Sequence, residues 1–201
     1  MKKEQRMFKN PILELLSLSG PIMMTIYHVV VASGIFIYGL LNHYDANLWL
    51  IILLFFGGYL SWTLAEYLLH RFVFHWVNDL KVVKEFHYAM HGYHHEVPHD
   101  HKRLFMPPVP VTLFVLAFLG IFYLIAGNYA WFILPGFELG YLTYAMCHYM
   151  VHTRPKSKFF AKLGHHHILH HYKYDDKAFG VSTRIWDRVF GTMPPKLKSK
   201  T

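Results

Sequence analysis

Cysteine and charged residues are both scarce in this sequence. Of its 201 residues one is a cysteine, Cys147, so no disulfide can form within the chain, and a disulfide-stapled secreted domain is excluded. Charged residues make up only 16% of the chain, whereas 54% are apolar and 18% are aromatic. This composition is too apolar for an ordinary water-soluble domain. Low-complexity tracts, internal repeats and long acidic tails are absent, which excludes extended disorder except at the two ends.

Acidic residues are few as well. Twelve Asp and Glu stand against 20 Lys and Arg, which gives a formal net charge of +8, and the 17 histidines outnumber the acids. The basic residues are dispersed and form no nucleic-acid recognition motif, so we expect no nucleic-acid partner. The sequence also lacks a glycine motif for dinucleotide binding. Histidine is therefore the unusual feature of the composition.

Four apolar blocks, at 22–41, 48–69, 111–126 and 129–150, predict membrane helices. A bilayer core of about 30 Å needs about 20 helical residues, and all blocks except the third are long enough. The third block follows three prolines and is joined to the fourth only by Gly127-Asn128, so these two blocks predict a tight helical hairpin that need not cross the whole bilayer. The alternative is four buried core helices, but the chain has too little polar surface to cover them. We predict an all-α integral membrane protein with about four membrane helices.

The positions of the basic residues predict the orientation in the membrane. Four Lys and Arg precede the first block, five lie between the second and third, and eleven follow the fourth. The connectors at 42–47 and 127–128 carry none. The positive-inside rule therefore places both termini and the central segment in the cytoplasm. No cleavable signal peptide is apparent, and the compact single-domain build favours a bacterial inner membrane over the endoplasmic reticulum.

Ten histidines stand in four short groups at or beyond the predicted cytoplasmic helix ends. They are His70 and His75; His91, His94 and His95; His148 and His152; and His167, His170 and His171. Residues at i, i+3 and i+4 share a helix face, so each triplet is expected to aim three imidazoles at one point, and His148 and His152 do the same. The first pair, at i and i+5, converges only if its helix bends or ends there.

These spacings predict metal binding, because imidazole is the commonest metal ligand in proteins. Ten imidazoles are too many for one ion and suit two. The alternative, an interfacial cationic patch that titrates near neutral pH, does not explain four groups with same-face spacing on one side of the membrane. The other seven histidines are expected to be surface or hydrogen-bonded residues: His28, His43, His87, His99, His101, His165 and His166.

Carboxylates are rare near these groups. Glu66 and Glu138 are the only acids within the apolar blocks, and neither stands in the Glu-x-x-His motif of a ferritin-like di-iron bundle. Glu66 precedes His70 by one turn and is expected to orient an imidazole. Glu138 is either functional or a hydrogen-bonded helix contact. Four further acids are candidates for orienting imidazoles: Asp100, Asp175, Asp176 and Asp187.

Between about Leu64 and Thr192 the chain resembles the integral-membrane fatty acid hydroxylase and sterol desaturase superfamily. His70-Arg-Phe-Val-Phe-His75, His91-Gly-Tyr-His-His95, His148-Tyr-Met-Val-His152 and His167-Ile-Leu-His-His171 match its histidine motifs in order. The segments Phe179-Gly-Val-Ser and Trp186-Asp-Arg-Val-Phe-Gly-Thr192 are similar to its closing region. Gly92 stands where sterol enzymes tend to carry Lys, which favours the fatty acid 2-hydroxylase branch.

The resemblance implies one membrane hydroxylase domain over 1–201, with cytoplasmic metal-binding segments at 70–110 and 148–192. The histidine-rich helical cap would hold a dinuclear metal site. The ligands carried over by position are His70, His75, His91, His94, His95, His148, His152, His167, His170 and His171. The implied reaction adds a hydroxyl at the 2-position of a long-chain fatty acid or fatty-acyl lipid, with dioxygen as co-substrate and two electrons.

The chemistry also indicates the cofactor. An unactivated methylene has no usefully acidic proton, so its hydroxylation needs a strong oxidant, and we expect two iron ions. Zinc fits the same ligands and can occupy them in purified protein, but it is redox-inert. With 201 residues and no fused haem domain of the eukaryotic kind, the chain is expected to use a separate electron-transfer protein as its external donor. The apolar slot for the substrate is expected between the four helices. Four aromatics near the cytoplasmic end either line it or serve in ordinary packing or an interfacial belt: Phe72, Phe74, Tyr149 and Tyr172.

Two other functions remain open at this point. A sterol or carotenoid hydroxylase or desaturase of the same superfamily would use the same metal chemistry on a different lipid. A histidine-based metal transporter or metal store would bind and release ions without consuming dioxygen. The lack of polar residues through the membrane blocks argues against transport.

Overall fold

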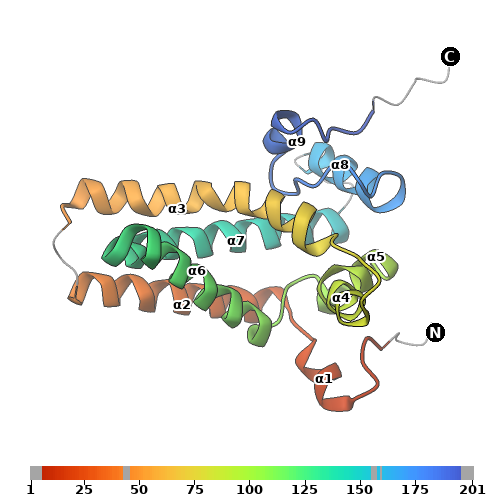
Figure 1. Ribbon diagram of the computed structural model, residues 1–201, viewed down its shortest axis with the longest axis horizontal. Coiled ribbons are helices and arrows are strands. Elements are labelled where there is room, and N and C mark those ends of the chain that lie inside the picture. Colours follow the sequence, from red (N-terminus) through yellow and green to blue (C-terminus); the bar gives the residue numbers. More distant parts are fainter. Residues whose placement is uncertain (1–5, 43–45, 155–157, 159, 196–201) are drawn as a thin grey trace.

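A computed structural model describes residues 6–42, 46–154, 158 and 160–195. Throughout these ranges the regular elements are helical and no strand occurs, which confirms the all-α prediction. Figure 1 shows the long helices side by side, with short helices gathered at one end of the bundle. The long helices are α2 (Pro21–Asn42), α3 (Leu48–Leu69), α6 (Pro108–Ala126) and α7 (Ala130–Thr153).

The long helices correspond to the four apolar blocks. Helix α6 begins at Pro108, three residues before the expected start at 111, because proline suits the first turn of a helix, where its missing N–H has no partner to lose. A short turn, η4 (Gly127–Tyr129), joins it to α7. Three stretches of the described residues are long and apolar enough to cross a membrane: Pro21–Asn42, Leu48–Phe74 and His101–Thr153. The third contains both α6 and α7.

The short helices form what we call the cap. Its elements are η1 (His70–Phe74), α4 (Lys81–His87), η2 (Tyr88–Gly92), α5 (Tyr93–Glu96), η3 (His101–Arg103), α8 (Ala161–Tyr172) and α9 (Ile185–Val189). A further short helix, α1 (Pro11–Leu16), lies at the same end of the bundle (Figure 1).

Helices α3 and α7 pack against each other at backbone distance. A Cβ atom added to Gly136 would lie 1.8 Å from the carbonyl oxygen of Phe55, and one added to Gly58 would lie 2.0 Å from that of Ile133. A Cβ atom added to Gly140 would also be too close to its neighbours, at 2.5 Å from the Trp62 Cβ. Small residues at such positions are typical of membrane helix pairs. The spacing of Gly136 and Gly140, four residues apart, is a sequence signal for this contact.

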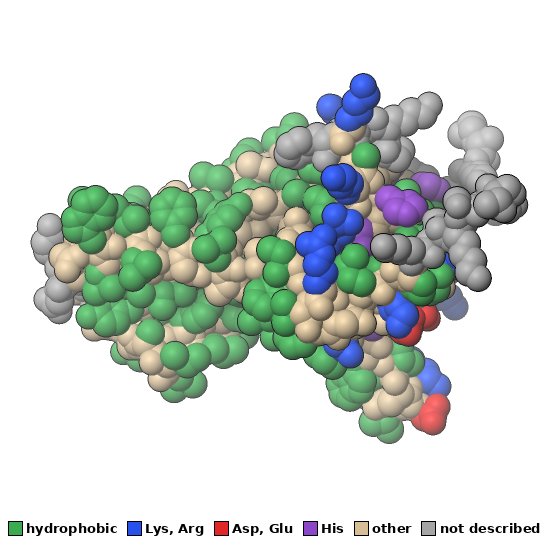
Figure 2. Space-filling model, turned by 90° about the horizontal axis from the view of Figure 1, so that it is seen from above, with side chains coloured by type: hydrophobic (Ala, Val, Ile, Leu, Met, Phe, Trp, Pro, Cys, Tyr) green, Lys and Arg blue, Asp and Glu red, His purple; other side chains and the backbone are tan. Residues whose placement is uncertain are grey.

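The surface divides into an apolar half and a polar half. Figure 2 shows hydrophobic side chains over the bundle, and most of the Lys, Arg, Asp, Glu and His on that face gathered toward the cap. Large apolar side chains on the bundle point outward, and Leu124, for example, is 87% exposed. Helices satisfy their own backbone polar groups, so such a surface suits contact with lipid hydrocarbon.

One polar contact is buried inside the apolar bundle. His28 of α2 and Glu138 of α7 are both buried, and His28 Nδ1 lies 2.6 Å from Glu138 Oε2. Glu138 therefore makes the hydrogen-bonded helix contact that was one of its two interpretations. His28, expected to be a surface or hydrogen-bonded residue, is its partner.

Candidate metal centre and lipid cavity

The first pair of histidines converges because α3 changes its winding where it ends. The η1 segment is a π-helix, and the amide of His75 donates to the carbonyl of His70 over 3.2 Å. A π-turn bonds residues i and i+5 and so widens the helix by one residue. It brings the two imidazole rings to a centroid distance of 5.1 Å. The π-turn is thus the change in the helix that His70 and His75 need in order to converge.

The ten grouped histidines form two sets of five. Within each set, one nitrogen from every ring lies within 4.8 Å of the others. The first histidine group consists of His70, His75, His91, His95 and His170. The second histidine group consists of His94, His148, His152, His167 and His171.

The expectation that each triplet aims at one point is wrong. His91 and His95 contribute to the first histidine group, whereas His94 contributes to the second. The other triplet divides in the same way, because His167 and His171 point to the second group and His170 to the first. Residues at i and i+4 stay together, and the third member of each triplet faces the other group. Each triplet thus lies between the two groups and offers imidazoles to both.

The nitrogen positions fit metal ions. In six pairs of rings, two Nε2 atoms lie 2.9 to 3.0 Å apart. An imidazole nitrogen binds zinc at about 2.1 Å, so two such nitrogens at right angles are about 3.0 Å apart. His70 Nδ1 donates to the carbonyl oxygen of Phe179 at 2.6 Å, and His170 Nδ1 donates to that of Lys177 at 2.7 Å. Their Nε2 atoms therefore carry lone pairs that a cation would stabilise.

The cap also keeps these imidazoles neutral, which metal binding requires. Burial lowers the pKa of His75 and of His95 to about 3, and the neighbouring His170 adds to both effects. Burial likewise lowers the pKa of His91 and of His94 well below its ordinary value. A neutral ring offers a lone pair at ordinary pH. The same burial argues against the cationic-patch alternative.

Two buried carboxylates hold the loop that orients His70. Asp187 accepts from the amides of Phe179 and Gly180 at 2.9 and 2.8 Å. Glu66 accepts from the amide of Val181 at 2.6 Å and from the amide and hydroxyl of Ser182. Glu66 was expected to orient an imidazole but contacts this loop instead, and the imidazole that Asp187 contacts is that of His166, outside the ten grouped histidines. The two carboxylates fix the backbone whose Phe179 carbonyl orients His70.

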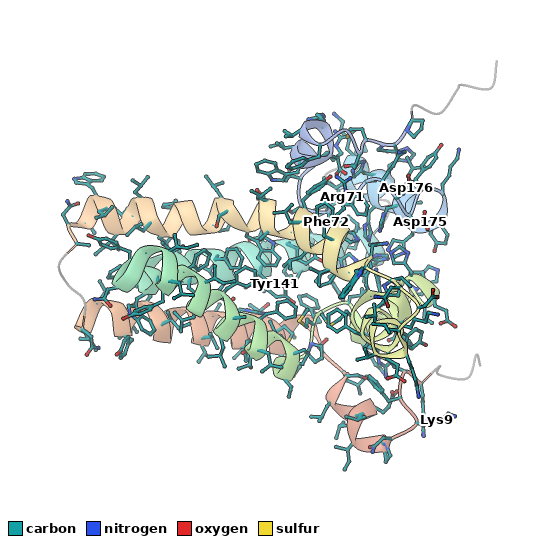
Figure 3. The ribbon with its side chains drawn as sticks, viewed as in Figure 1. Lys9, Arg71, Phe72, Tyr141, Asp175 and Asp176 are labelled. Carbon is teal, nitrogen blue, oxygen red and sulfur yellow. The ribbon has the colours of Figure 1, made fainter. Side chains whose placement is uncertain are left out.

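The remaining acidic candidates lie away from the ligands. Asp100 pairs with Arg103 and accepts from the Tyr93 hydroxyl at 3.0 Å. Asp175 and Asp176 are exposed beyond the end of α8 (Figure 3), and Asp176 lies 3.4 Å from the Lys177 ammonium. All three were expected to orient imidazoles, and their observed positions and partners are different. The orienting groups are backbone carbonyls, which side-chain patterns do not reveal.

Two of the other histidines also have defined partners. His166 Nε2 lies 2.9 Å from Asp187 Oδ2, so it supports the carboxylate that holds the loop. His87 Nδ1 donates to the carbonyl oxygen of Phe74 at 2.6 Å and so supports the π-turn. His43 lies outside the described residues. The resulting structural roles agree with the expectation of hydrogen-bonded histidines.

A cavity of about 320 Å³ joins the second histidine group to the interior of the bundle. His91, His94 and His148 border it at the cap, and Trp62, Phe118 and Phe137 border it deep between the long helices. Tyr141, which Figure 3 shows between these helices, lies along the way. The wall is largely apolar, as expected of a slot for a lipid chain.

Only one of the four aromatics named as possible lining residues borders this cavity. Phe74 is part of its wall. Phe72 is 58% exposed and Tyr172 is 65% exposed, and Tyr149 packs against Phe105 with ring centroids 5.8 Å apart. Ordinary packing, one of the alternatives to lining the slot, describes Tyr149.

A family model for fatty acid hydroxylases matches residues 55–192 of the chain. This match covers all ten grouped histidines. The chain belongs to the fatty acid hydroxylase family. Its resemblance to that superfamily and to the 2-hydroxylase branch is thereby confirmed, since curated 2-hydroxylases are among its relatives.

Fatty acid 2-hydroxylase of Rattus norvegicus is 39% identical over 149 residues, which are 71% of this chain and 40% of the relative. Dihydroceramide fatty acyl 2-hydroxylase FAH2 of Arabidopsis thaliana is 39% identical over 139 residues, 68% of this chain and 59% of the relative. The chain thus spans about 40% to 60% of the length of these fatty acid hydroxylases. A solved structure titled full-length scs7p, with only its hydroxylase domain visible, has a TM-score of 0.84 at 33% identity and covers 94% of this chain and 71% of that one.

Proposed function

We propose that this member of the fatty acid hydroxylase family hydroxylates the 2-position of a long acyl chain in a membrane lipid. The observation that carries the proposal is the junction of metal centre and cavity, since His91, His94 and His148 belong to the two histidine groups and also border the apolar cavity. A chain in this cavity would present a methylene to the metal ligands. The names of the rat and plant relatives support the 2-position and a fatty acyl substrate.

The charges beside the cavity favour an uncharged acyl amide or ester over a free fatty acid. Arg103 borders the cavity near Ser17, but its guanidinium pairs with both Glu14 and Asp100. One cation between two carboxylates leaves a net negative charge there. That charge would repel a free carboxylate or a phosphate, whereas an amide can still hydrogen-bond.

The two histidine groups would each hold one iron ion, through the five residues named for each. When bound, the iron pair supplies the redox chemistry that activates dioxygen with two electrons from a separate electron-transfer protein. The chain's own part is to hold Nε2 lone pairs in place, through carbonyls such as that of Phe179 at His70 Nδ1. The apolar wall around Tyr141 and Phe137 excludes water and limits how the chain can lie.

We further propose that the cap, the metal centre and both termini face the cytoplasm, with the apolar half in the membrane. The distribution of Lys and Arg supports this orientation. The relatives named above come from a mammal and a plant, so the similarity gives no preference for the bacterial inner membrane that the compact build indicated. The single hydroxylase domain over 1–201 is proposed on the same footing, supported by the match at 55–192.

The test is mass spectrometry of total fatty acids, after hydrolysis, from cells that express the wild-type chain, His94→Ala or His165→Ala. His165 is exposed on α8 and belongs to neither histidine group, so it is the matched control. New 2-hydroxy acids are expected with the wild type and with His165→Ala, and none with His94→Ala, which should remain in the membrane.

Absence of 2-hydroxy acids from iron-loaded wild type with a competent reductant would contradict the proposal. A gain of one oxygen in a sterol or carotenoid would then assign the other substrate class. Metal flux into vesicles without dioxygen consumption would indicate transport.

A further inference from the structure

The deep end of the lipid cavity is closed by packed aromatic rings. The aromatic plug consists of Trp62 of α3, Phe118 and Phe122 of α6, and Phe137 of α7. The Phe137 ring centroid lies 4.5 Å from that of Phe118, 5.0 Å from that of Trp62 and 5.2 Å from that of Phe122. Three of these rings border the cavity, and Phe122 packs behind them. Three helices thus contribute to one barrier.

The backbone contact of α3 with α7 limits movement of this plug. Gly140 lies under Trp62, whose Cβ would be 2.5 Å from a Cβ added to the glycine. Trp62 is buried and also contacts Tyr141 edge-to-face, with centroids 5.1 Å apart. Two helices held at backbone distance cannot separate to admit a longer ligand without breaking their packing. The part of the plug that α3 and α7 supply, Trp62 and Phe137, is therefore held in place by the fold.

The position of the plug gives the cavity a defined depth. His148 and Phe137 lie on the same helix, eleven residues apart, which corresponds to about 16 Å along its axis. Because the bonds of an extended alkyl chain zigzag, a carbon–carbon bond of about 1.5 Å advances the chain by roughly 1.25 Å, so this distance is the length of about 13 methylenes. The hydroxylated carbon would lie near His148, so these methylenes count from that carbon.

We propose that the aromatic plug sets the upper limit of acyl-chain length for this enzyme, with chains of roughly 14 to 16 carbons fitting between the metal ligands and Phe137. This inference rests on the proposed function, since it specifies the substrate of the same site. Longer chains would have to displace Phe118 or Phe137. The plug is thus a specificity determinant, and its residues take no part in the chemistry.

The experiment offers purified, iron-loaded wild-type protein, supplied with dioxygen and a competent reductant, an equimolar series of acyl lipids with even chain lengths and records which are hydroxylated. The test variants are Phe118→Leu, which is half-buried on α6, and Phe137→Leu. The control is Phe132→Leu, because Phe132 is fully buried on α7 but does not border the cavity. Truncation of a plug ring should move the length limit upward by about two carbons, since it shortens the side chain by roughly two bonds of about 1.5 Å.

A second measurement keeps the result independent of turnover. The midpoint of thermal unfolding is recorded with added saturated acyl lipids of each length, and the length that stabilises most should shift upward in the plug variants only. An unchanged length dependence in both plug variants, or an equal shift in Phe132→Leu, would overturn the proposal. If the wild type binds with a length limit but hydroxylates nothing, the proposed function fails while the plug remains.

Discussion

The two histidine groups differ in how the chain builds them. The second histidine group takes two histidine pairs at i and i+4, His148 with His152 and His167 with His171, from the regular helices α7 and α8. The first histidine group includes His70 and His75, which meet across a π-turn. Two of its rings are also oriented by carbonyls of the loop after α8, those of Lys177 and Phe179.

This difference has a physical consequence. A histidine pair built on helical spacing needs only that its helix forms, because neighbouring turns bring the two side chains together. A group built on a π-turn and a loop needs tertiary contacts to hold an irregular backbone. Glu66 and Asp187 supply those contacts for the loop. The first histidine group should therefore be the more sensitive one to changes outside its ligands.

The largest effect is expected from removing one ligand from either group. His170→Ala and His94→Ala should each abolish hydroxylation, because each leaves one ion short of a nitrogen. Each variant should retain the ion of the other group, so metal analysis should fall from two ions per chain toward one. Loss of both ions in each variant would show that the two groups are not independent.

Next in size is the loss of a loop contact. Glu66→Gln and Asp187→Asn replace buried acceptors of backbone amides, and a change behind a metal ligand typically costs about 10- to 100-fold in metal affinity or activity. The loss should fall on the first histidine group, with the second retaining its ion. Titration of bound metal checks this.

The matched control for these two variants is Glu138→Gln, a buried carboxylate that contacts His28 and not the loop. It should leave the affinity of the first group unchanged. Equal metal loss from both groups in Glu66→Gln would contradict the assignment of Glu66 to the first histidine group alone.

A third test disturbs the helix contact that sets the distance between the two histidine groups. His70 follows the end of α3 and His148 lies on α7, so the contact of these helices fixes their distance. Gly58→Ala places a Cβ 2.0 Å from the Ile133 carbonyl oxygen and should destabilise the fold by about 1–3 kcal/mol or more. Gly57→Ala, whose added Cβ meets nothing within 4 Å, should be neutral or stabilising by up to about 1 kcal/mol. Thermal unfolding of the pair in detergent or lipid checks the difference, and equal midpoints would argue against the close contact.

The smallest effect is expected at His87. Its hydrogen bond to the Phe74 carbonyl supports the π-turn, but the ring belongs to neither group. His87→Ala should keep two ions per chain and reduce activity less than the loop variants do, as measured by metal content and initial rate. Loss of an ion from this variant would make His87 a ligand that the geometry does not indicate.

The features that rest on regular helical spacing could be predicted from the sequence, whereas those that rest on the π-turn and the loop could not. The apolar blocks predict the helices, and the i and i+4 pairs predict their own convergence because helical spacing is a local property. The division of each triplet between two groups could not be predicted, because it depends on where η1, α5, α7 and α8 lie in space. The i and i+5 spacing of His70 and His75 predicts convergence only if the helix bends or ends there, and the π-turn fulfils that condition.

The carbonyls of Lys177 and Phe179 escaped prediction for another reason, since every residue carries a backbone carbonyl and the residue type says nothing about its use. Glu66 was singled out for its rarity within an apolar block, and its partner turned out to be the loop. In the sequence, only its similarity to the family's closing region marks the segment that starts at Phe179. That similarity was the one signal of its importance.

The most direct test of two separate centres is an X-ray anomalous difference map, recorded at the iron edge from crystals of the iron-loaded protein. Two peaks are expected, one among His70, His75, His91, His95 and His170, and the other among His94, His148, His152, His167 and His171. A single peak, or a peak shared by His91, His94 and His95, would contradict the division of the histidines into two groups.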